Sequence, residues 1–188
     1  MMCSKTAVYL YGSVSLYKYL VNERSACIMH ADCFAGGENM LKGISPLISP
    51  ELLKVLCEMG HGDEIVLADA NFPSETTGKR VIRADGIGAA DLLKAILPLF
   101  PLDTYEKDRF ILMEVVPGDP VVPVIWDEYK EILNEQEPGT PVEFMERFAY
   151  YERAKNAYCV VATGETAQYA NIILKKGVVY TDQTKKSC

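Results

Sequence analysis

The stretch Ser49-Pro-Glu-Leu-Leu-Lys-Val-Leu-Cys-Glu-Met-Gly-His-Gly-Asp-Glu-Ile-Val-Leu-Ala-Asp69 decides the fold class. Its first half predicts a helix, because the serine can cap the N-terminus, the proline suits the first turn, and leucines recur on one face. Gly60 suits the position at which such a helix stops. The run from Glu64 to Asp69 is short and apolar in its middle, which is typical of a buried strand. A helix is therefore followed at once by a strand, and His61 lies on the turn between them.

The same alternation continues along the rest of the chain. Strands are predicted at 81–84, 110–116, 158–163 and 171–174, and helices at 89–97, 124–136 and 148–157. Several strands are apolar throughout, which indicates a sheet that is buried on both faces. We therefore expect an α/β fold, a layered single domain with a mostly parallel central sheet flanked by helices.

The length of 188 residues fits one domain. The clear periodic signals begin after the turn-rich Gly36-Gly-Glu-Asn39. We expect residues 40–188 to form the domain that carries the function. Residues 1–39 are expected to be an N-terminal extension of unknown role, either disordered or artificially added.

Composition and charge exclude several classes of partner. The net charge of −7 argues against nucleic acid and anionic membranes, which need a local excess of Lys and Arg. No apolar run is long enough to span a membrane, and no clear signal sequence begins the chain, so we expect a cytoplasmic protein. The six cysteines form no CxxC pair, which favours free thiols. Cys57 and Cys159 lie in apolar runs and are expected to act as small hydrophobic residues.

His61 is the candidate for proton transfer, because its side chain titrates near neutral pH and its turn is flanked by glycines. The alternative is an exposed turn histidine without a chemical role. Asp69 and Asp85 each follow a strand, where they could accept hydrogen bonds from the hydroxyls of a small ligand or merely cap the next turn. No HxH, HExxH or cysteine pair occurs, so we expect no metal, and no glycine pattern indicates a nucleotide.

The run Arg147-Phe-Ala-Tyr-Tyr-Glu-Arg153 would place Arg147 and Tyr151 on one face of a helix, since they are four residues apart. From spacing alone, these two side chains suit a ligand site as well as they suit the core or the surface. No serine elbow and no cysteine beside a base is found, which disfavours covalent catalysis.

Ordered motifs across residues 40–179 give the chain a specific resemblance. The motifs are Leu47-Ile-Ser-Pro-Glu-Leu-Leu53, Met59-Gly-His-Gly-Asp-Glu-Ile-Val66, Ala68-Asp-Ala-Asn-Phe-Pro73, Arg83-Ala-Asp-Gly86, Pro101-Leu-Asp103, Arg147-Phe-Ala-Tyr-Tyr-Glu-Arg153, Ala162-Thr-Gly-Glu165 and Tyr169-Ala-Asn171. In these motifs the chain resembles the fucose mutarotase and ribose pyranase family, and the Arg83 and Arg147 segments are similar to its fucose branch. Ala170 departs from the glycine that many members have there.

The resemblance implies an enzyme that exchanges the α- and β-anomers of L-fucose without a cofactor. It implies a ring-shaped homo-oligomer, such as a decamer, with sites at the subunit interfaces. By motif, His61 matches the family's proton donor. The matching sugar contacts are Asp69, Arg147, Tyr169 and Asn171, with Asp103 and Tyr151 as further contacts in animal-type members. The alternatives are a monosaccharide-binding protein without catalytic activity and a ribose pyranase.

These residue types suit the reaction that the resemblance implies. Mutarotation needs one proton delivered to the ring oxygen and one removed from the anomeric hydroxyl, after which the ring opens, rotates and closes again. A positioned acid or base with a pKa near neutral contributes about 10²–10⁴ in rate to such a step. One histidine with hydrogen-bonding Asp, Arg, Asn and Tyr side chains is therefore sufficient.

Overall fold

The computed structural model describes residues 41–180, so the extension predicted at residues 1–39 lies outside the described residues. A six-stranded sheet forms the centre, with strand order β2-β5-β1-β6-β3-β4. The strands are β1 (Glu64–Ala68), β2 (Val81–Ala84), β3 (Phe110–Met113), β4 (Glu143–Met145), β5 (Cys159–Thr163) and β6 (Ile172–Lys175). Only β6 runs antiparallel to its neighbours, β1 and β3. The expected α/β fold with a mostly parallel sheet is confirmed.

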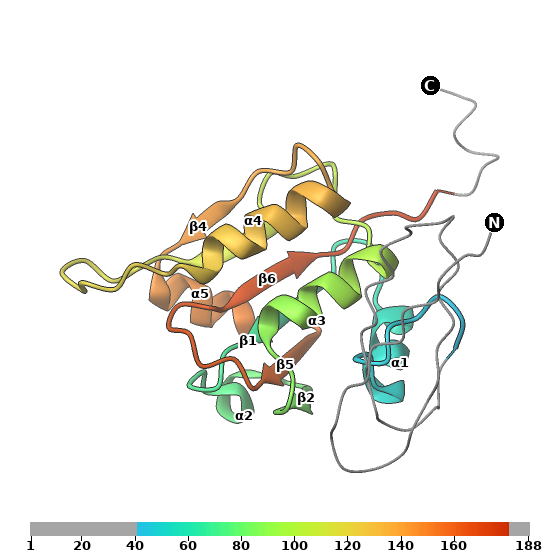
Figure 1. Cartoon of the computed structure of the whole chain (residues 1–188), viewed down its shortest axis with the longest axis horizontal. Coiled ribbons are helices and arrows are strands. Elements are labelled where there is room, and N and C mark those ends of the chain that lie inside the picture. The colour runs from blue at the N-terminus through green and yellow to red at the C-terminus, as the bar shows by residue number, and fades with distance from the viewer. Residues whose placement is uncertain (1–40, 181–188) are drawn as a thin grey trace, which may run out of the picture. The chain divides into compact units, whose positions relative to one another are not determined.

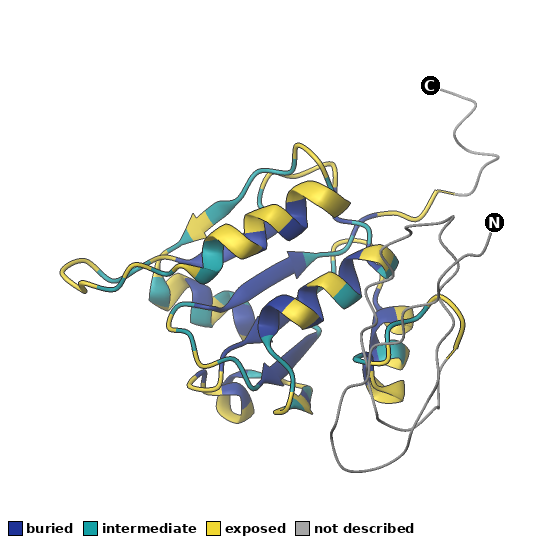
Figure 2. Cartoon of the chain, viewed as in Figure 1, coloured by how far each residue is buried: buried dark blue, intermediate teal, exposed yellow. Residues whose placement is uncertain are grey.

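Helices cover both faces of this sheet (Figure 1). They are α1 (Pro50–Glu58), α2 (Ser74–Thr77), α3 (Ala89–Ile96) with the short 3₁₀ turn η1 (Leu97–Leu99), α4 (Ile125–Gln136) and α5 (Arg147–Ala154). One core joins α1, α3 and α4 to strand residues such as Leu67 and Val161. A second core joins Tyr150 of α5 to the alternate strand residues, such as Val66 and Val160. Successive side chains of a strand point to opposite faces, which is why the apolar strands are buried throughout (Figure 2).

The predicted start of α1 is confirmed, but the reason for its end is different. The Ser49 hydroxyl accepts a hydrogen bond from the Leu52 amide at 3.1 Å, and a proline follows the cap. Met59 ends the helix in an extended conformation, and the left-handed glycine is Gly62, with φ of +86°, rather than Gly60. The backbone therefore turns next to His61, between the helix and β1.

Short or edge elements account for most of the differences from the predicted elements. The sequence did not predict α2 and β4, which have four and three residues, because segments this short show no periodicity. β3 ends at Met113 rather than at residue 116. Cys57 is exposed on α1, which contradicts its expected burial, whereas Cys159 is buried and its thiol pKa is raised by burial to about 11. No helix within residues 41–180 is long and apolar enough to cross a membrane.

Candidate active site

The predicted site residues lie at two opposite edges of the sheet. Asp69 directly follows β1, whereas His61 precedes the same strand by three residues. A strand rises about 3.3 Å per residue, so the first and last Cα atoms of β1 are roughly 13 Å apart. A single chain therefore does not bring His61 to Asp69. We call the two regions the Asp69 edge, with Asp69, Arg147, Tyr169 and Asn171, and the His61 edge, with His61, Asp103 and Tyr105.

The centre of the Asp69 edge is a buried pair of side chains. The Asn171 side chain accepts a hydrogen bond from the Asp69 amide at 2.9 Å and donates one to Asp69 Oδ2 at 2.7 Å. Asp69 Oδ1 accepts from the Asn71 amide at 2.9 Å. Burial raises the pKa of Asp69, and these hydrogen bonds oppose the shift. The structure thus brings together Asp69 and Asn171, two of the sugar contacts that the family resemblance implies.

Tyr169 begins the segment that leads into Asn171, and its backbone is strained. Its φ is +58°, a left-handed conformation that a residue with a large side chain rarely adopts. The Tyr169 carbonyl accepts a hydrogen bond from Trp126 Nε1 at 2.8 Å, and its hydroxyl donates to Asp119 Oδ2 at 2.6 Å. Sequence reasoning missed Asp119 and Trp126, because partners 50 and 43 residues away leave no local pattern.

Arg147 and Tyr151 enter this region from α5. The Glu146 side chain caps the helix by accepting from the amides of Phe148 and Ala149, which fixes where Arg147 begins it. The Arg147 guanidinium lies 4.7 Å from the centre of the Phe148 ring, and its buried Nε has no hydrogen-bond partner among the described residues. The Tyr151 ring packs 5.5 Å from Phe72, on the segment that follows Asp69. Arg147 therefore has a buried donor for which residues 41–180 supply no acceptor.

A surface pocket of about 440 Å³ opens on the other side of Asp69, toward β5 and β2. Its lining includes Asp69, Thr163, Arg83 and Asp85. Arg83 Nε donates to Asp85 Oδ2 at 3.0 Å, so this candidate carboxylate is already paired. Tyr169, Asn171 and Arg147 do not line the pocket. Only Asp69 is common to the pocket and the predicted sugar contacts.

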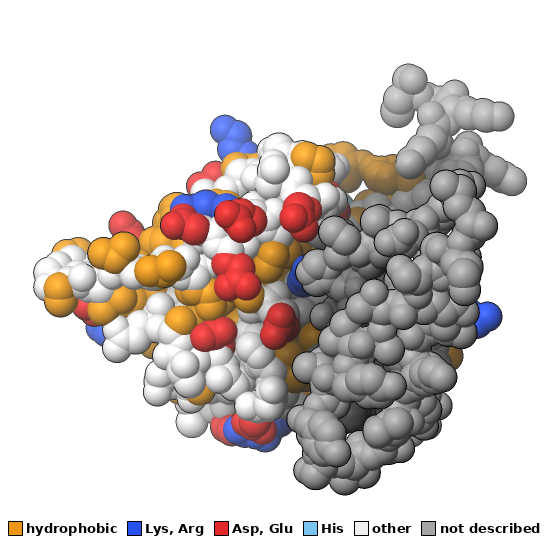
Figure 3. All heavy atoms as spheres, in the orientation of Figure 1, with side chains coloured by type: hydrophobic (Ala, Val, Ile, Leu, Met, Phe, Trp, Pro, Cys, Tyr) orange, Lys and Arg blue, Asp and Glu red, His pale blue; other side chains and the backbone are white. Residues whose placement is uncertain are grey.

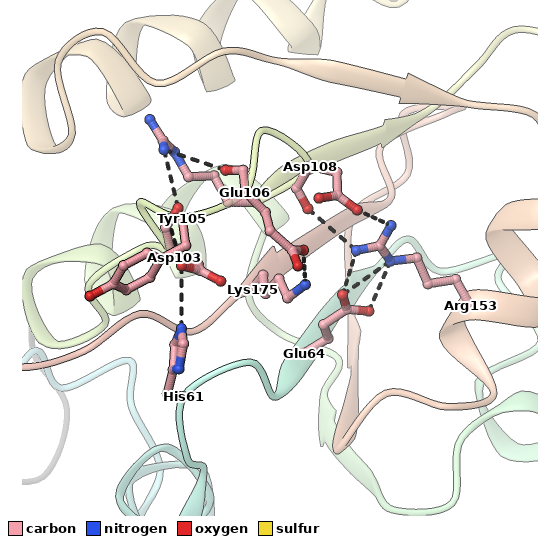
Figure 4. A network of polar contacts seen from close by, with 9 residues as sticks. His61, Glu64, Asp103, Tyr105, Glu106, Asp108, Arg153 and Lys175 are labelled. Atoms are coloured by element: carbon pink, nitrogen blue, oxygen red, sulfur yellow. Dashed lines mark hydrogen bonds and ion pairs between the residues drawn. The ribbon is translucent and has the colours of Figure 1, made fainter.

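The His61 edge pairs an exposed imidazole with a buried carboxylate (Figure 4). His61 Nε2 lies 3.3 Å from Asp103 Oδ1; the two side chains are 46% and 3% exposed. Burial acts to raise the pKa of Asp103, but a hydrogen bond from the Tyr105 amide and the contact with His61 outweigh it, so the pKa is lowered. The Tyr105 ring meets the imidazole edge-on at 5.5 Å. Asp103 therefore contacts the proton-transfer candidate and lies away from the other predicted sugar contacts.

Charged side chains hold the segment that carries Asp103 and Tyr105. Arg153 Nε reaches both carboxylate oxygens of Glu64 at 3.1 and 3.0 Å, and its Nη1 donates to Asp108 at 2.6 Å. Lys175 pairs with Glu106 on the same segment. Figure 4 shows how these ion pairs come from β1, α5 and β6 and converge on one loop. No local sequence pattern indicates this network, because Arg153 and Glu64 are 89 residues apart.

Proton transfer and hydroxyl recognition are the two kinds of chemistry that these edges can carry. Within residues 41–180, no three His, Cys, Asp or Glu side chains gather in a way that could hold a metal ion. The arrangement is that of an α/β protein that handles a small polar ligand, with one imidazole able to move protons. The chain belongs to the RbsD / FucU transport protein family, whose sequence model matches residues 42–179.

Individual relatives are similar over almost their whole length. The L-fucose mutarotase of Actinobacillus pleuropneumoniae is 56% identical over 140 residues, which are 74% of this chain and 97% of that protein. The crystal structure of FucU from Bifidobacterium longum is 58% identical and superposes with a TM-score of 0.72, covering 74% of this chain and 100% of that one. The fucose mutarotase of Streptococcus pneumoniae in complex with L-fucose is 52% identical with a TM-score of 0.71 and the same coverage.

Proposed function

We propose that this protein is an isomerase that interconverts the α- and β-anomers of L-fucose. The observation that carries the proposal is its 56% identity with an L-fucose mutarotase over 97% of that relative's length. A second relative, 52% identical, is described in complex with L-fucose. The geometry adds one group suited to proton transfer, His61 beside Asp103, and a separate edge with fixed polar groups.

The proposed reaction breaks and re-forms one C–O bond of the sugar and moves two protons. The bond between the anomeric carbon and the ring oxygen breaks, the ring oxygen gains a proton, and the anomeric hydroxyl loses one to leave an aldehyde. Rotation of the aldehyde and the reverse transfer give the other anomer. His61 supplies or accepts one of these two protons, and the other is exchanged with water. Asp69, Arg147, Tyr169 and Asn171 hold the sugar hydroxyls, with Tyr151 beside them. Since no electron or group is transferred, the residues of the chain suffice without a cofactor.

We propose further that the site is built from two copies of the chain. His61 and Asp69 are separated by the length of β1, and a monosaccharide held by the Asp69 edge cannot reach the imidazole of the same copy. A neighbour that presents its His61 edge to this Asp69 edge completes the site. Two observations support this arrangement. The buried Nε of Arg147 has no hydrogen-bond partner within residues 41–180. The His61 side chain, which contacts Asp103 through Nε2, remains 46% exposed and so is accessible to a neighbouring copy.

Apolar side chains are exposed near both edges, as such a contact requires. The segment 114–124 projects from the sheet at the Asp69 edge (Figure 1), and hydrophobic side chains gather on this part of the surface in the same orientation (Figure 3). Val122 and Val124 of this segment are 81% and 77% exposed. Near the His61 edge, Tyr105 is 71% exposed and Val179 is 69% exposed. Because the two surfaces differ, they join copies head to tail, and a head-to-tail contact that closes on itself gives a ring.

Saturation-transfer NMR on equilibrated α- and β-L-fucose tests the activity. We expect magnetisation to pass between the anomeric protons faster than in buffer, and faster for fucose than for ribose. Exchange at the rate of buffer, with saturable fucose binding, would contradict catalysis and identify a binding protein. Preferential exchange of ribose would identify a ribose pyranase instead.

Light scattering tests the assembly. We expect a mass several times that of the 20.9 kDa chain, and the paired change Val122→Asp with Val124→Asp should lower both the mass and the exchange rate. A fully active monomer would contradict the shared site.

Two further proposals concern the whole chain. We propose that the domain at residues 40–188 carries the activity and that residues 1–39 are an extension of unknown role, since the family model matches residues 42–179. We also propose a cytoplasmic location, where the free thiols of Cys57 and Cys159 remain reduced.

A further inference from the structure

Tyr169 is held at both ends in a conformation that its own backbone disfavours. A φ of +58° costs energy for tyrosine and persists only where surrounding contacts impose it. Trp126 of α4 donates to the Tyr169 carbonyl at 2.8 Å, and Asp119 accepts from its hydroxyl at 2.6 Å. Residues 169–171 lead directly into the buried pair of Asn171 and Asp69. The strain is therefore located in the segment that holds the proposed sugar contacts.

Asp119 is itself fixed by the turn on which it lies. The sequence Val116-Pro-Gly-Asp119 forms a turn in which the Asp119 amide donates to the Val116 carbonyl at 3.0 Å, with Gly118 at φ +90°. Asp119 Oδ1 accepts from the Val121 amide at 3.1 Å, which leaves Oδ2 for the tyrosine. Both carboxylate oxygens thus have defined partners, and the acceptor that Tyr169 meets has a defined position.

These contacts decide which hydrogen bonds the Tyr169 hydroxyl can still make. A phenol has one hydrogen and two acceptor positions. The hydrogen is directed to Asp119 at 2.6 Å, the length of a charge-assisted bond. The Val116 amide approaches the same oxygen at 3.4 Å and occupies one acceptor position. One acceptor position remains, so toward a ligand the oxygen can accept a hydrogen bond but has no hydrogen to donate.

We propose that Asp119 is a positioning residue for the mutarotase reaction, which commits the Tyr169 hydrogen so that Tyr169 meets a sugar hydroxyl only as an acceptor. The proposal rests on the proposed function, since it needs Tyr169 to contact the sugar. It makes Tyr169 selective for a free hydroxyl at the contacted position, because an ether oxygen or a missing hydroxyl supplies no donor. Asp119 acts through Tyr169 and does not touch the substrate.

A double-mutant cycle tests the proposal in the full chain. The variants are Asp119→Ala, Tyr169→Phe and both together, with exchange measured against fucose concentration. We expect Asp119→Ala to raise the concentration for half-maximal exchange about tenfold, the typical effect of one lost hydrogen bond, with a smaller change in the maximal rate. In the Tyr169→Phe variant, which already lacks the hydroxyl, Asp119→Ala should not change this concentration further. Asp119→Asn keeps an acceptor oxygen, so its fucose concentration for half-maximal exchange should lie between the values for the unchanged protein and Asp119→Ala.

The control removes a comparable charge elsewhere on the same part of the chain. Asp127 pairs with Lys130 in the first turn of α4, with its side chain 78% exposed, so Asp127→Ala should leave the fucose dependence unchanged. A readout independent of activity is the ionisation of Tyr169, whose pKa is raised because Asp119 accepts its hydrogen. Ultraviolet difference titration against Tyr169→Phe should show this ionisation at lower pH in Asp119→Ala.

Three outcomes overturn the proposal. If Asp119→Ala raised the fucose concentration for half-maximal exchange equally in the unchanged protein and in Tyr169→Phe, Asp119 would not act through the Tyr169 hydroxyl. A fucose dependence that Asp119→Ala leaves unchanged would show that the contact has no role. A separate outcome concerns the proposed function. If the unchanged protein binds fucose without interconverting its anomers, the proposed function fails. Calorimetric fucose binding by the unchanged protein, the two single variants and the double variant would still show whether Asp119 and Tyr169 act together. An unchanged protein that neither exchanges nor binds fucose overturns both proposals.

Discussion

The two edges of the sheet hold their key carboxylates in opposite ways. At the Asp69 edge, Asp69 is bound to Asn171 and to the backbone, and burial raises its pKa. At the His61 edge, the Asp103 side chain also has little exposure to solvent, and its contacts with the Tyr105 amide and His61 lower its pKa. The polar partners of each carboxyl group therefore contribute to the direction of its pKa shift.

The difference matches what each edge would do in the proposed reaction. Holding a sugar requires acceptors and donors that do not move, and the Asp69 edge supplies them from the ends of strands and from the start of α5. Moving a proton requires a group that the ligand can reach, and the His61 imidazole is half exposed while Asp103 holds it from behind. The comparison predicts that changes at the two edges affect different steps.

The largest effect is expected from His61→Ala. Loss of the imidazole that is proposed to transfer the proton should lower the anomer exchange rate by about 10²–10⁴. The fold should remain, because the side chain is 46% exposed. Saturation-transfer NMR measures the rate, and circular dichroism checks the fold. A folded variant that keeps its full exchange rate would assign the proton transfer to another residue.

Mixing two inactive variants tests whether the edges meet between copies. His61→Ala is defective at one edge, and Asp69→Asn at the other. After both are unfolded together and refolded, about a quarter of the head-to-tail contacts should pair an intact His61 edge with an intact Asp69 edge. The anomer exchange rate of the mixture should then recover to about a quarter of the rate of the unchanged protein. A mixture of His61→Ala with His61→Asn is the control, and any recovery there, or none in the first mixture, would contradict the shared site.

Arg153→Met should show how the His61 edge is stabilised. It removes the cation between Glu64 and Asp108, whose side chains are 15% and 42% exposed. We expect unfolding to need about 2 kcal/mol less free energy, below the value for a fully buried pair because water screens part of the charge. Chemical denaturation measures the change. Arg80→Met, which breaks an exposed pair with Glu58, is the control and should have little effect.

Long, periodic segments were predictable from the sequence because their signal is local. The capped α1 and the apolar β1 and β5 were predicted nearly residue by residue, since repeated burial on one or both faces fixes their composition. The three-residue β4 was not, because its pairing with β3 is a tertiary contact that three residues cannot signal. The exposure of Cys57 also depends on which face of α1 meets the sheet.

The site was only partly predictable, for a related reason. The family resemblance identified residues at both edges, but it treated them as one group. The predicted strand between His61 and Asp69 already implied their separation, because an extended run of five residues spans more than a sugar ring. No local pattern indicated the partners that fix the geometry, such as Asp119 for Tyr169 or Arg153 for Glu64. Pairs so far apart in the chain are set by the fold.

The smallest expected effect is a difference between two titrations. From an ordinary value of 3.8, the pKa of Asp69 is raised and that of Asp103 is lowered. A raised carboxyl pKa means that the folded protein binds the proton more readily than the unfolded chain, so the contribution of Asp69 to stability is present at low pH and is lost as pH rises through its folded pKa. Asp103 has the opposite sign, and its contribution is lost as pH falls below 3.8 through its folded pKa. Carboxyl ¹³C NMR should therefore show Asp69 gaining its proton first on acidification. The reverse order would mean that burial, and not the polar partners, dominates at the His61 edge.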